Sequence, residues 1–213
     1  AHMVSHDLKT PLRNIATIVS RLKADYKNVF DQNGIEQLIM LESRTEKLER
    51  LINDILEYSS ITHNSKNEDV DILELFNDIK ANIGTMDLPY ELIHSSSLPI
   101  LKNYNYTRLY QLFINLFTNS IKYCDKEKAI IHITVLEDNE KYIFKIEDNG
   151  IGIDDKFKHK VFKIFQKLDK NKENSTGVGL AIVKKIVDVY GGNIELKSKL
   201  GEGSTFYISL EKK

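Results

Sequence analysis

Apolar residues recur with heptad spacing through the first sixty positions of the chain. The first run is spaced 4-3-4-3-4 and consists of Val4, Leu8, Pro11, Ile15, Ile18 and Leu22, with Leu12 and Val19 beside them. The second run is spaced 3-4-3-4-3-4 and consists of Leu38, Leu41, Thr45, Leu48, Ile52, Ile55 and Ser59. This period is typical of helices that pack along a seam. The turn signal Asn33-Gly34 between the runs predicts a helical hairpin.

Two helices with heptad seams bury their apolar faces poorly on their own, whereas two such hairpins form a four-helix bundle. The pattern therefore predicts a homodimer. His6 lies two residues from Val4 and two residues from Leu8, so we expect it off the seam and facing solvent.

The polar stretch 62–69 (THNSKNED) has no apolar periodicity and predicts a linker. Beyond it, the pattern predicts helices at 71–83, 107–124 and 176–192, and strands at 90–97, around 100–101, and at 129–138, 141–148, 193–200 and 203–212. Helices combined with antiparallel hairpins favour an α+β two-layer sandwich, one sheet covered by helices on one face. We expect a hairpin domain at 1–65 and the sandwich at 66–213.

Composition narrows the class of protein. The formal net charge of −1 gives no electrostatic reason to expect nucleic acid or an anionic membrane as a partner. Cys124 is the single cysteine, so the chain can form no internal disulfide and no cysteine-based metal cluster, and a reducing cytoplasmic setting fits. No apolar run reaches the roughly 18 residues of a membrane span. The helix predicted so close to the start suggests a cytoplasmic fragment of a longer protein, either soluble or membrane-anchored.

Two glycine-containing stretches could bind a nucleotide. In 147–154 (EDNGIGID), Asp148 ends a strand and could accept a hydrogen bond from an exocyclic amine, while Gly150 and Gly152 allow a flat ligand to approach. A plain glycine turn is the alternative. In 175–183 (STGVGLAIV), glycines open a helix whose amides could bind phosphate. The stretch is not a Walker P-loop, because the GK[ST] ending is missing.

A polar stripe follows the predicted helix at 107–124. Asn115, Asn119 and Lys122 recur at i, i+4 and i+7, opposite apolar residues. Two amides and a lysine on one face suit an oxygen-rich site for Mg²⁺ and phosphate. An ordinary solvated face is the alternative.

The opening stretch SHDLKTP sets His6 beside Asp7 and places Pro11 inside a predicted helix. Proline removes an amide hydrogen and clashes with the carbonyl four residues earlier, that of Asp7, so the backbone there should be irregular. These residues alone do not separate a frayed helix start, capped by Ser5 or Asp7, from an exposed reactive histidine.

The ordered set of motifs SHDLKTP, NLFTNSIKY, EDNGIG, FKIFQKL, STGVGLAIV and GEGSTF resembles the sensor histidine kinases of two-component signalling, over nearly the whole chain. The resemblance implies an ATP-binding sandwich like that of DNA gyrase and a class of heat-shock chaperones. It also implies a homodimeric four-helix bundle and transfer of a phosphoryl group from ATP, with Mg²⁺, to histidine and then to the receiver domain of a response regulator.

The same resemblance assigns roles to single residues. His6 is the phosphoacceptor and Asp7 accepts a hydrogen bond or proton from its ring. Asn115 and Asn119 meet Mg²⁺, Lys122 touches phosphate and Tyr123 packs on the purine. The remaining nucleotide contacts are assigned to Asp148, Gly150, Gly152, Gly177, Gly179 and Thr205. Phe162 and Phe165 precede an ATP lid at about 166–176, although core packing also explains them. Ser175 stands where many family members have glycine.

Two other readings remain open. The chain could be a non-catalytic, ATP-sensing dimerisation module, or it could act mainly as a phosphatase toward its regulator. Thr10, four residues after His6, keeps the second reading open.

Overall fold

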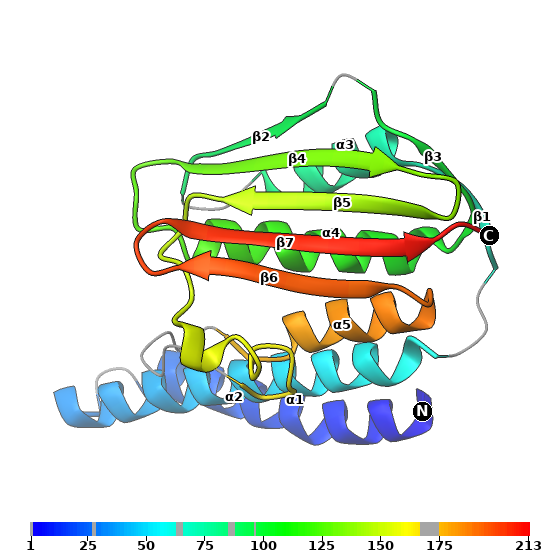
Figure 1. Ribbon diagram of the computed structural model, residues 1–213. Helices are drawn as coiled ribbons and strands as arrows, with labels where there is room; N and C mark the ends of the chain where they lie inside the picture. The colour runs from blue at the N-terminus through cyan, green and yellow to red at the C-terminus, as the bar shows by residue number, and fades with distance from the viewer. Residues whose placement is uncertain (1, 27–28, 63–65, 85–87, 96, 167–174) are drawn as a thin grey trace. The chain divides into compact units, whose positions relative to one another are not determined.

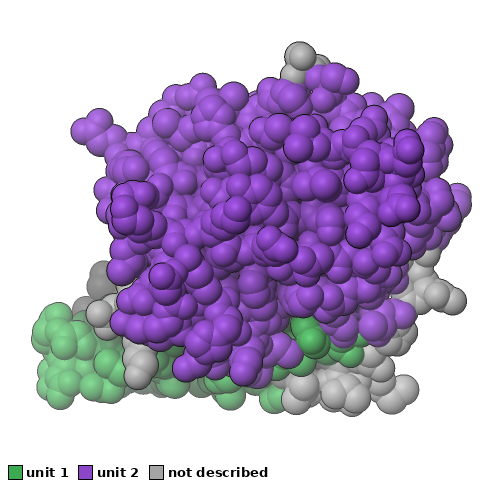
Figure 2. Space-filling model, viewed as in Figure 1, with its two compact units in different colours: residues 1–60, 170–176 green, residues 61–169, 177–213 purple. Residues whose placement is uncertain are grey.

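The structure, a computed structural model, describes residues 2–26, 29–62, 66–84, 88–95, 97–166 and 175–213, and within them the side chains from Lys9 onward. The chain forms two compact units, coloured separately in Figure 2: unit 1 holds residues 1–60 and 170–176, and unit 2 holds 61–169 and 177–213. The domain boundary that we expect between 65 and 66 stays a prediction, because residues 63–65 lie outside the described ranges.

Unit 1 contains a hairpin of two long helices (Figure 1), α1 at His2–Asp25 and α2 at Gln32–Ser60. Helix α1 runs on through Pro11, so the proline does not end it. The predicted turn residues Asn33 and Gly34 lie inside the first turn of α2. The reason is local. The side chain of Asp31 accepts a hydrogen bond from the Gly34 amide at 2.7 Å and so caps α2, which begins at Gln32, before the predicted turn residues.

The heptad seam of α2 divides into two sets of positions. Leu38 and Thr45 are buried, whereas Leu41, Leu48 and Ile55 stay 45%, 50% and 45% exposed. Each set repeats every seven residues, so each occupies one line along the helix. One line is covered within the chain and the other faces outward.

Helix α1 shows the same division, with a correction to the predicted seam. The buried residues are Leu12 and Val19, which we placed beside the seam, whereas the seam residues Ile15 and Ile18 are exposed. The heptad pattern therefore predicted the apolar residues of this helix but not which of them the hairpin covers.

Unit 2 is an α+β sandwich, as predicted (Figure 1). Its elements, in order, are β1 (Glu68–Asp71), α3 (Ile72–Ile83), β2 (Tyr90–His94), β3 (Ile100–Tyr104), α4 (Tyr106–Lys122), β4 (Ala129–Glu137), β5 (Lys141–Asp148), the 3-10 turn η1 (Asp155–Phe157), α5 (Gly179–Val189), β6 (Asn193–Lys199) and β7 (Gly203–Glu211).

Five strands form the main sheet in the order β2-β4-β5-β7-β6. Strand β2 runs parallel to β4, and every other neighbouring pair is antiparallel. Helices α3, α4 and α5 lie on one side of this sheet (Figure 1). Strands β1 and β3 pair separately as a small antiparallel ribbon.

The core of unit 2 lies between the helices and the sheet. Burial alternates along β5 and β7, as expected for strands with one covered face. Phe113 of α4 meets Phe76 of α3 and Phe144 of β5 edge-to-face, with ring centroids 5.0 and 5.1 Å apart. This contact joins the two layers and fixes α4, the helix that carries the predicted asparagine stripe, over the centre of the sheet.

Two predicted boundaries change. The linker expected at 62–69 gives up its last residues to β1, because Val70 pairs with Leu101 of β3 and draws Glu68 and Asp69 into the ribbon. The helix expected from 176 begins at Gly179, since Gly177 has a left-handed φ of 75° that an α-helix does not accept.

Candidate nucleotide site

Asp148 stands at the end of β5 with its carboxylate oriented by two backbone amides. Its Oδ1 accepts hydrogen bonds from the Gly150 amide at 2.9 Å and from the Ser204 amide at 3.1 Å. Its Oδ2 has one long contact, 3.5 Å, with the Ser120 hydroxyl of α4. Burial raises the pKa of Asp148 above its usual range, and the two amides and Ser120 act in the opposite direction. One oxygen is thus fixed by the protein while the other keeps most of its accepting capacity.

The glycine loop that follows Asp148 packs backbone against backbone on both sides. A Cβ on Gly150 would lie 2.8 Å from the carbonyl oxygen of Tyr123, and the Ile151 amide donates to that same carbonyl at 2.9 Å. On the other side, Gly152 has φ 70° and a Cβ there would lie 2.0 Å from the carbonyl oxygen of Lys199. Both glycines are therefore required by close packing against the end of α4 and the β6–β7 hairpin, while their predicted role in admitting a flat ligand stays a prediction.

Asn115 and Asn119 are both half-buried on α4 and face the start of α5. The Asn115 Nδ2 donates to the Gln111 carbonyl at 2.8 Å, which turns its Oδ1 toward Gly179. A Cβ on Gly179 would lie 2.6 Å from this oxygen and 3.8 Å from the Asn119 Nδ2. The missing side chain therefore lets the amide-bearing N-terminus of α5 approach the asparagine stripe.

Lys122 and Tyr123 close the stripe at the end of α4. The Lys122 Nζ lies 5.9 Å from the centroid of the Tyr123 ring, and both side chains are half-buried. Tyr123 also ends the helix, and its amide donates to the Asn119 carbonyl at 2.9 Å. The lysine and the tyrosine therefore lie at the same end of the sheet as Asp148, where the carbonyl of Tyr123 already contacts the glycine loop.

The segment before the predicted lid differs from the expectation of core packing. Phe162 is half-buried, but Phe165 is 54% exposed and has a left-handed φ of 64°. A Cβ on Gly177 would lie 2.7 Å from the carbonyl oxygen of Gln166, so the two flanks of the predicted lid meet here. Residues 167–174 of the lid lie outside the described ranges, and Ser175 is half-buried.

Thr205 is not brought to this site. The β5–β7 register sets Asp148 opposite Ser204 and Glu147 opposite Thr205. Because side chains alternate along a strand, Asp148 and Ser204 share the helix-covered face and Thr205 lies on the other face. Ser204 is accordingly buried and Thr205 only half-buried.

Two serines that contact Asp148, Ser120 and Ser204, are not among the residues predicted from the sequence. Ser120 is buried within the apolar stripe of α4, and a lone hydroxyl among leucines and phenylalanines was the available signal. Ser204 donates its amide to Asp148, and only the strand register distinguishes it from Thr205.

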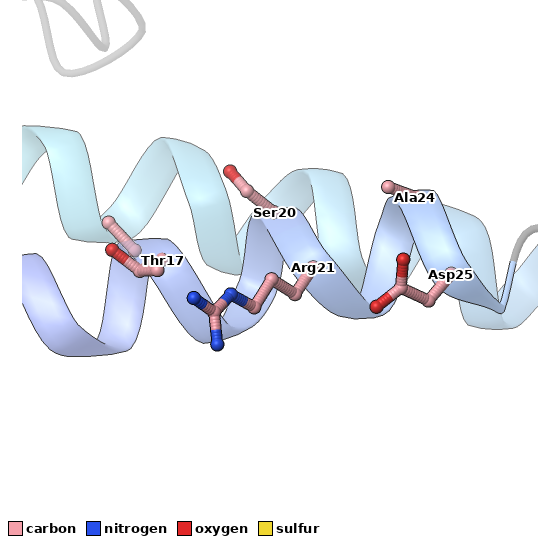
Figure 3. Close-up of a pocket in the computed structure, with 6 residues that line it drawn as sticks. Thr17, Ser20, Arg21, Ala24 and Asp25 are labelled. Atoms are coloured by element: carbon pink, nitrogen blue, oxygen red, sulfur yellow. The ribbon is translucent and has the colours of Figure 1, made fainter.

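The phosphoacceptor candidates belong to unit 1. His6 and Asp7 lie within the backbone of α1, and their side chains are outside the described set. Thr10 is exposed on the same helix. Farther along α1, an open groove is lined by Ala16, Thr17, Ser20, Arg21, Ala24 and Asp25, most of which Figure 3 shows as sticks along the helix. None of the predicted site residues lines this groove.

The site in unit 2 combines three kinds of group near the end of β5, the end of α4 and the start of α5. A half-satisfied carboxylate can accept a hydrogen bond from an amine, as on an adenine ring. Amide oxygens on α4 suit a hard cation, and the backbone amides at the start of α5, where Val178 makes no side-chain capping bond, suit phosphate.

Two family models match the chain. Residues 104–213 match the model of histidine kinase-, DNA gyrase B- and HSP90-like ATPases. Residues 1–64 match the model of the His Kinase A (phospho-acceptor) domain.

Among named proteins, cyanobacterial phytochrome A of Nostoc sp. (strain PCC 7120) is 35% identical over 223 residues, which cover 99% of this chain and 28% of the relative. Sensor protein kinase WalK of Staphylococcus haemolyticus is 30% identical, with 97% of this chain and 35% of the relative covered. The chain thus spans little more than a third of these curated relatives at most.

Solved structures share the fold. Full-length ShkA in complex with AMPPNP matches with a TM-score of 0.74 at 21% identity, covering 100% of this chain and 45% of ShkA. Histidine kinase ThkA in complex with the response regulator TrrA matches with a TM-score of 0.65 at 22% identity, covering 100% of this chain and 60% of ThkA. Among the helices that the structure describes, none has the length and apolar composition needed to cross a membrane.

Proposed function

Because the chain belongs to the sensor histidine kinases of two-component signalling, we propose that it transfers the γ-phosphoryl group of ATP to His6 and then to an aspartate of a response regulator. The observation that carries the proposal is the orientation of Asp148. Two amides occupy its Oδ1, which leaves Oδ2 to accept from the 6-amino group of adenine.

The phosphates of ATP fit the opposite side of the same site. The Asn115 Oδ1, turned toward Gly179, and the neighbouring Asn119 are suited to hold Mg²⁺, which would neutralise phosphate charge. Lys122 adds a positive charge. The backbone amides of Gly179 and the next residues, at the N-terminus of α5, are suited to bind the phosphates. Tyr123 packs on the purine, and Gly177 ends the lid. In place of Thr205, we propose Ser204 as the β7 residue of the base site.

The chemistry at His6 follows from its imidazole. Near neutral pH the ring keeps a lone pair that can attack the γ-phosphorus, with ADP as the leaving group. Asp7 accepts the proton or a hydrogen bond from the other ring nitrogen and so keeps the attacking nitrogen nucleophilic. Transfer requires the γ-phosphate held by residues 66–213 to reach His6 in the domain at 1–65. We place the reaction in the cytoplasm, where ATP is available.

We also propose that the hairpin dimerises into a four-helix bundle. The support is the outward line of Leu41, Leu48 and Ile55 on α2, together with exposed Ile15 and Ile18 on α1. A second copy would cover both lines, as the heptad repeat of each helix requires.

The partner of the phosphorylated chain is a receiver domain of a response regulator. ThkA, which shares this fold, was solved in complex with such a protein. Thr10 is exposed one helical turn after His6, so a docked regulator would present its phospho-aspartate near both residues. A hydroxyl there can position water for hydrolysis, which favours a second, phosphatase activity toward the regulator.

Incubation with γ-labelled ATP and Mg²⁺ tests the proposal. The chain should incorporate label that is labile in acid and stable in alkali, and His6→Ala should remove the label while ATP binding persists. A non-catalytic ATP-sensing module would bind ATP without incorporating label. Full labelling of His6→Ala would exclude His6 as the acceptor.

A further inference from the structure

The carboxylate of Asp148 depends on two chain segments that are far apart in sequence. The Gly150 amide belongs to the loop 150–153, and the Ser204 amide belongs to the start of β7. If these segments shifted relative to each other, Oδ1 would lose one of its two donors and the carboxylate would rotate. Whatever fastens the loop to the hairpin therefore sets the direction of the free Oδ2.

Ser198, near the end of β6, connects these same two segments. Its Oγ accepts a hydrogen bond from the Ile153 amide of the loop at 2.7 Å and donates one to the Gly203 carbonyl at the start of β7 at 2.8 Å. It also lies 3.0 Å from the Ser204 hydroxyl. Ser198 thus holds the loop through Ile153. It also holds the start of β7 through Gly203 and Ser204, and Ser204 carries the second amide that binds Asp148.

The hydrogen-bonding capacity of Ser198 is fully used in this position. A hydroxyl has one proton to donate and two lone pairs to accept with. Since the carbonyl of Gly203 can only accept, the Ser198 proton is committed there, and the Ser204 hydroxyl must donate to Ser198. Removing the Ser198 hydroxyl would therefore leave three groups without this partner, from both segments at once.

The backbone around Ser198 makes the same connection tighter. The Gly201 amide donates to the Ile151 carbonyl at 2.8 Å, and a Cβ on Gly203 would lie 2.0 Å from the Asp148 carbonyl oxygen. The β6–β7 turn thus lies directly on the glycine loop, and Ser198 supplies the side-chain part of this contact.

We propose that Ser198 is a positioning residue for adenine recognition, which acts by holding the two amide donors that orient Asp148. The inference rests on the proposed ATP site and adds to it a residue that does not touch the nucleotide. It predicts that Ser198 affects binding of the 6-amino group specifically and leaves binding of the phosphates unchanged.

The strands offer a matched control at their other end. Ser209 also bridges β6 and β7: its Oγ accepts from the Asn193 amide at 3.0 Å and donates to the Asn193 carbonyl at 3.4 Å. It contacts neither the loop nor Asp148 in these bonds. Ser209→Ala therefore removes a comparable inter-strand hydroxyl without disturbing the two donors.

The test compares the dissociation constants of ATP and of purine riboside triphosphate, which lacks the 6-amino group, for the full chain. Ser198→Ala should weaken ATP binding roughly three- to tenfold, as expected for hydrogen-bond loss, and should weaken binding of the analogue less than about twofold. Ser209→Ala should change neither constant. The readout is the ratio of the dissociation constant of the analogue to that of ATP, which Ser198→Ala should lower. If Ser198→Ala does not fold, Ser198→Cys, whose thiol makes weaker hydrogen bonds, should lower this ratio by a smaller factor.

Three outcomes would overturn the inference. An unchanged ratio in a folded Ser198 variant means that Ser198 does not orient Asp148, and an equal loss for both nucleotides means that it supports only the fold. A wild-type chain that fails to bind ATP would overturn the proposed function itself, and the inference with it. Asp148→Asn separates these cases, since it should lose the preference for ATP wherever the proposed site is correct.

Discussion

Helices α2 and α4 are both amphipathic, yet the chain covers them differently. Helix α4 buries its entire apolar stripe, which comprises Leu109, Leu112, Phe113, Leu116, Phe117 and Ile121, each at 2% exposure or less. Helix α2 buries Leu38 and Thr45, while Leu41, Leu48 and Ile55 of the same seam stay exposed. The first stripe faces a sheet and two further helices within unit 2. Among the described helices of unit 1, the second stripe faces one partner, α1.

The two units therefore differ in how their apolar residues are covered: the sandwich covers them within one chain, and the hairpin leaves some of them exposed. The sandwich contains its own core, so the proposed ATP site can be held by close backbone packing at Gly150 and Gly152 and by the contact of Gly179 with the Asn115 side chain. Each helix of the hairpin leaves apolar residues exposed, Ile15 and Ile18 on α1 and Leu41, Leu48 and Ile55 on α2, and a second copy of the chain would cover them. We expect changes in the hairpin to act on assembly and changes in the sandwich to act on folding and nucleotide binding.

The largest expected effect is on dimerisation. Replacing both Leu48 and Ile55 with Lys puts charges on the outward line of α2, where burial of each apolar side chain is worth about 1.5–3 kcal/mol. The dimer should dissociate at least about 100-fold more readily, as measured by sedimentation equilibrium. Ile39→Lys is the control, because Ile39 is 49% exposed but lies off the seam, and it should leave the dimer intact. A wild-type monomer at micromolar concentration would contradict the bundle.

The next largest expected effect is a loss of stability in the sandwich when the glycine loop is changed. Gly152→Ala would place a Cβ 2.0 Å from the Lys199 carbonyl oxygen at a left-handed φ, so it should lower the free energy of unfolding by about 3 kcal/mol. Gly201→Ala is a matched control with φ 79° and no atom within 4 Å of the added Cβ, and it should cost about 1 kcal/mol. Urea unfolding measures both. Equal losses would show that backbone strain, and not packing of the glycine loop, sets the requirement for glycine.

Asp148→Asn should separate binding from stability within unit 2. The amide must keep its oxygen on the Gly150 and Ser204 donors, which turns its NH₂ toward the adenine amino group. ATP binding should therefore weaken roughly 10- to 100-fold by titration calorimetry. Burial disfavours the charged form of Asp148, so the variant should unfold with equal or slightly higher free energy, by up to about 1 kcal/mol near pH 7.

The pH dependence of that stability difference gives an independent readout. Because the folded-state pKa of Asp148 is raised, its contribution to stability is fully present below the unfolded pKa of about 3.9 and is lost as the pH rises through the folded pKa. The advantage of the variant should accordingly shrink between about pH 7 and pH 4. An advantage that grows on acidification would mean that the two amides outweigh burial.

The elements of both units could be predicted because their apolar periods are local. Which residues they bring together depends on pairing between distant segments. Thr205 was predicted at the adenine and Ser204 was not, since only the β5–β7 register sets Asp148 opposite Ser204. The sequence places Glu68 and Asp69, the first half of β1, in a linker, because these polar residues become part of a strand only through pairing with β3. In the hairpin, the heptad pattern identifies the apolar residues. It does not tell which of them pack inside one hairpin and which would pack against a second copy of the chain.

The smallest expected effect concerns Thr10 and the regulator. Thr10→Ala should retain substantial autophosphorylation and lengthen the lifetime of the phosphorylated regulator a few-fold, because histidine attack on ATP needs no positioned water whereas hydrolysis does. The measurement follows decay of purified phospho-regulator with each variant. Equal losses of both activities would instead point to damage to α1 near Pro11.

The central claim is that ATP bound through Asp148 phosphorylates His6, and locating the phosphate tests it most directly. After reaction with Mg-ATP, tryptic cleavage after Lys9 at alkaline pH releases residues 1–9, which contain His2 and His6. Fragment masses should place one phosphate on His6 in the wild-type chain, and initial phosphorylation of Asp148→Asn should be several-fold lower at an ATP concentration close to the wild-type dissociation constant. Phosphate on His2, on a hydroxyl residue or outside residues 1–9 would contradict the account.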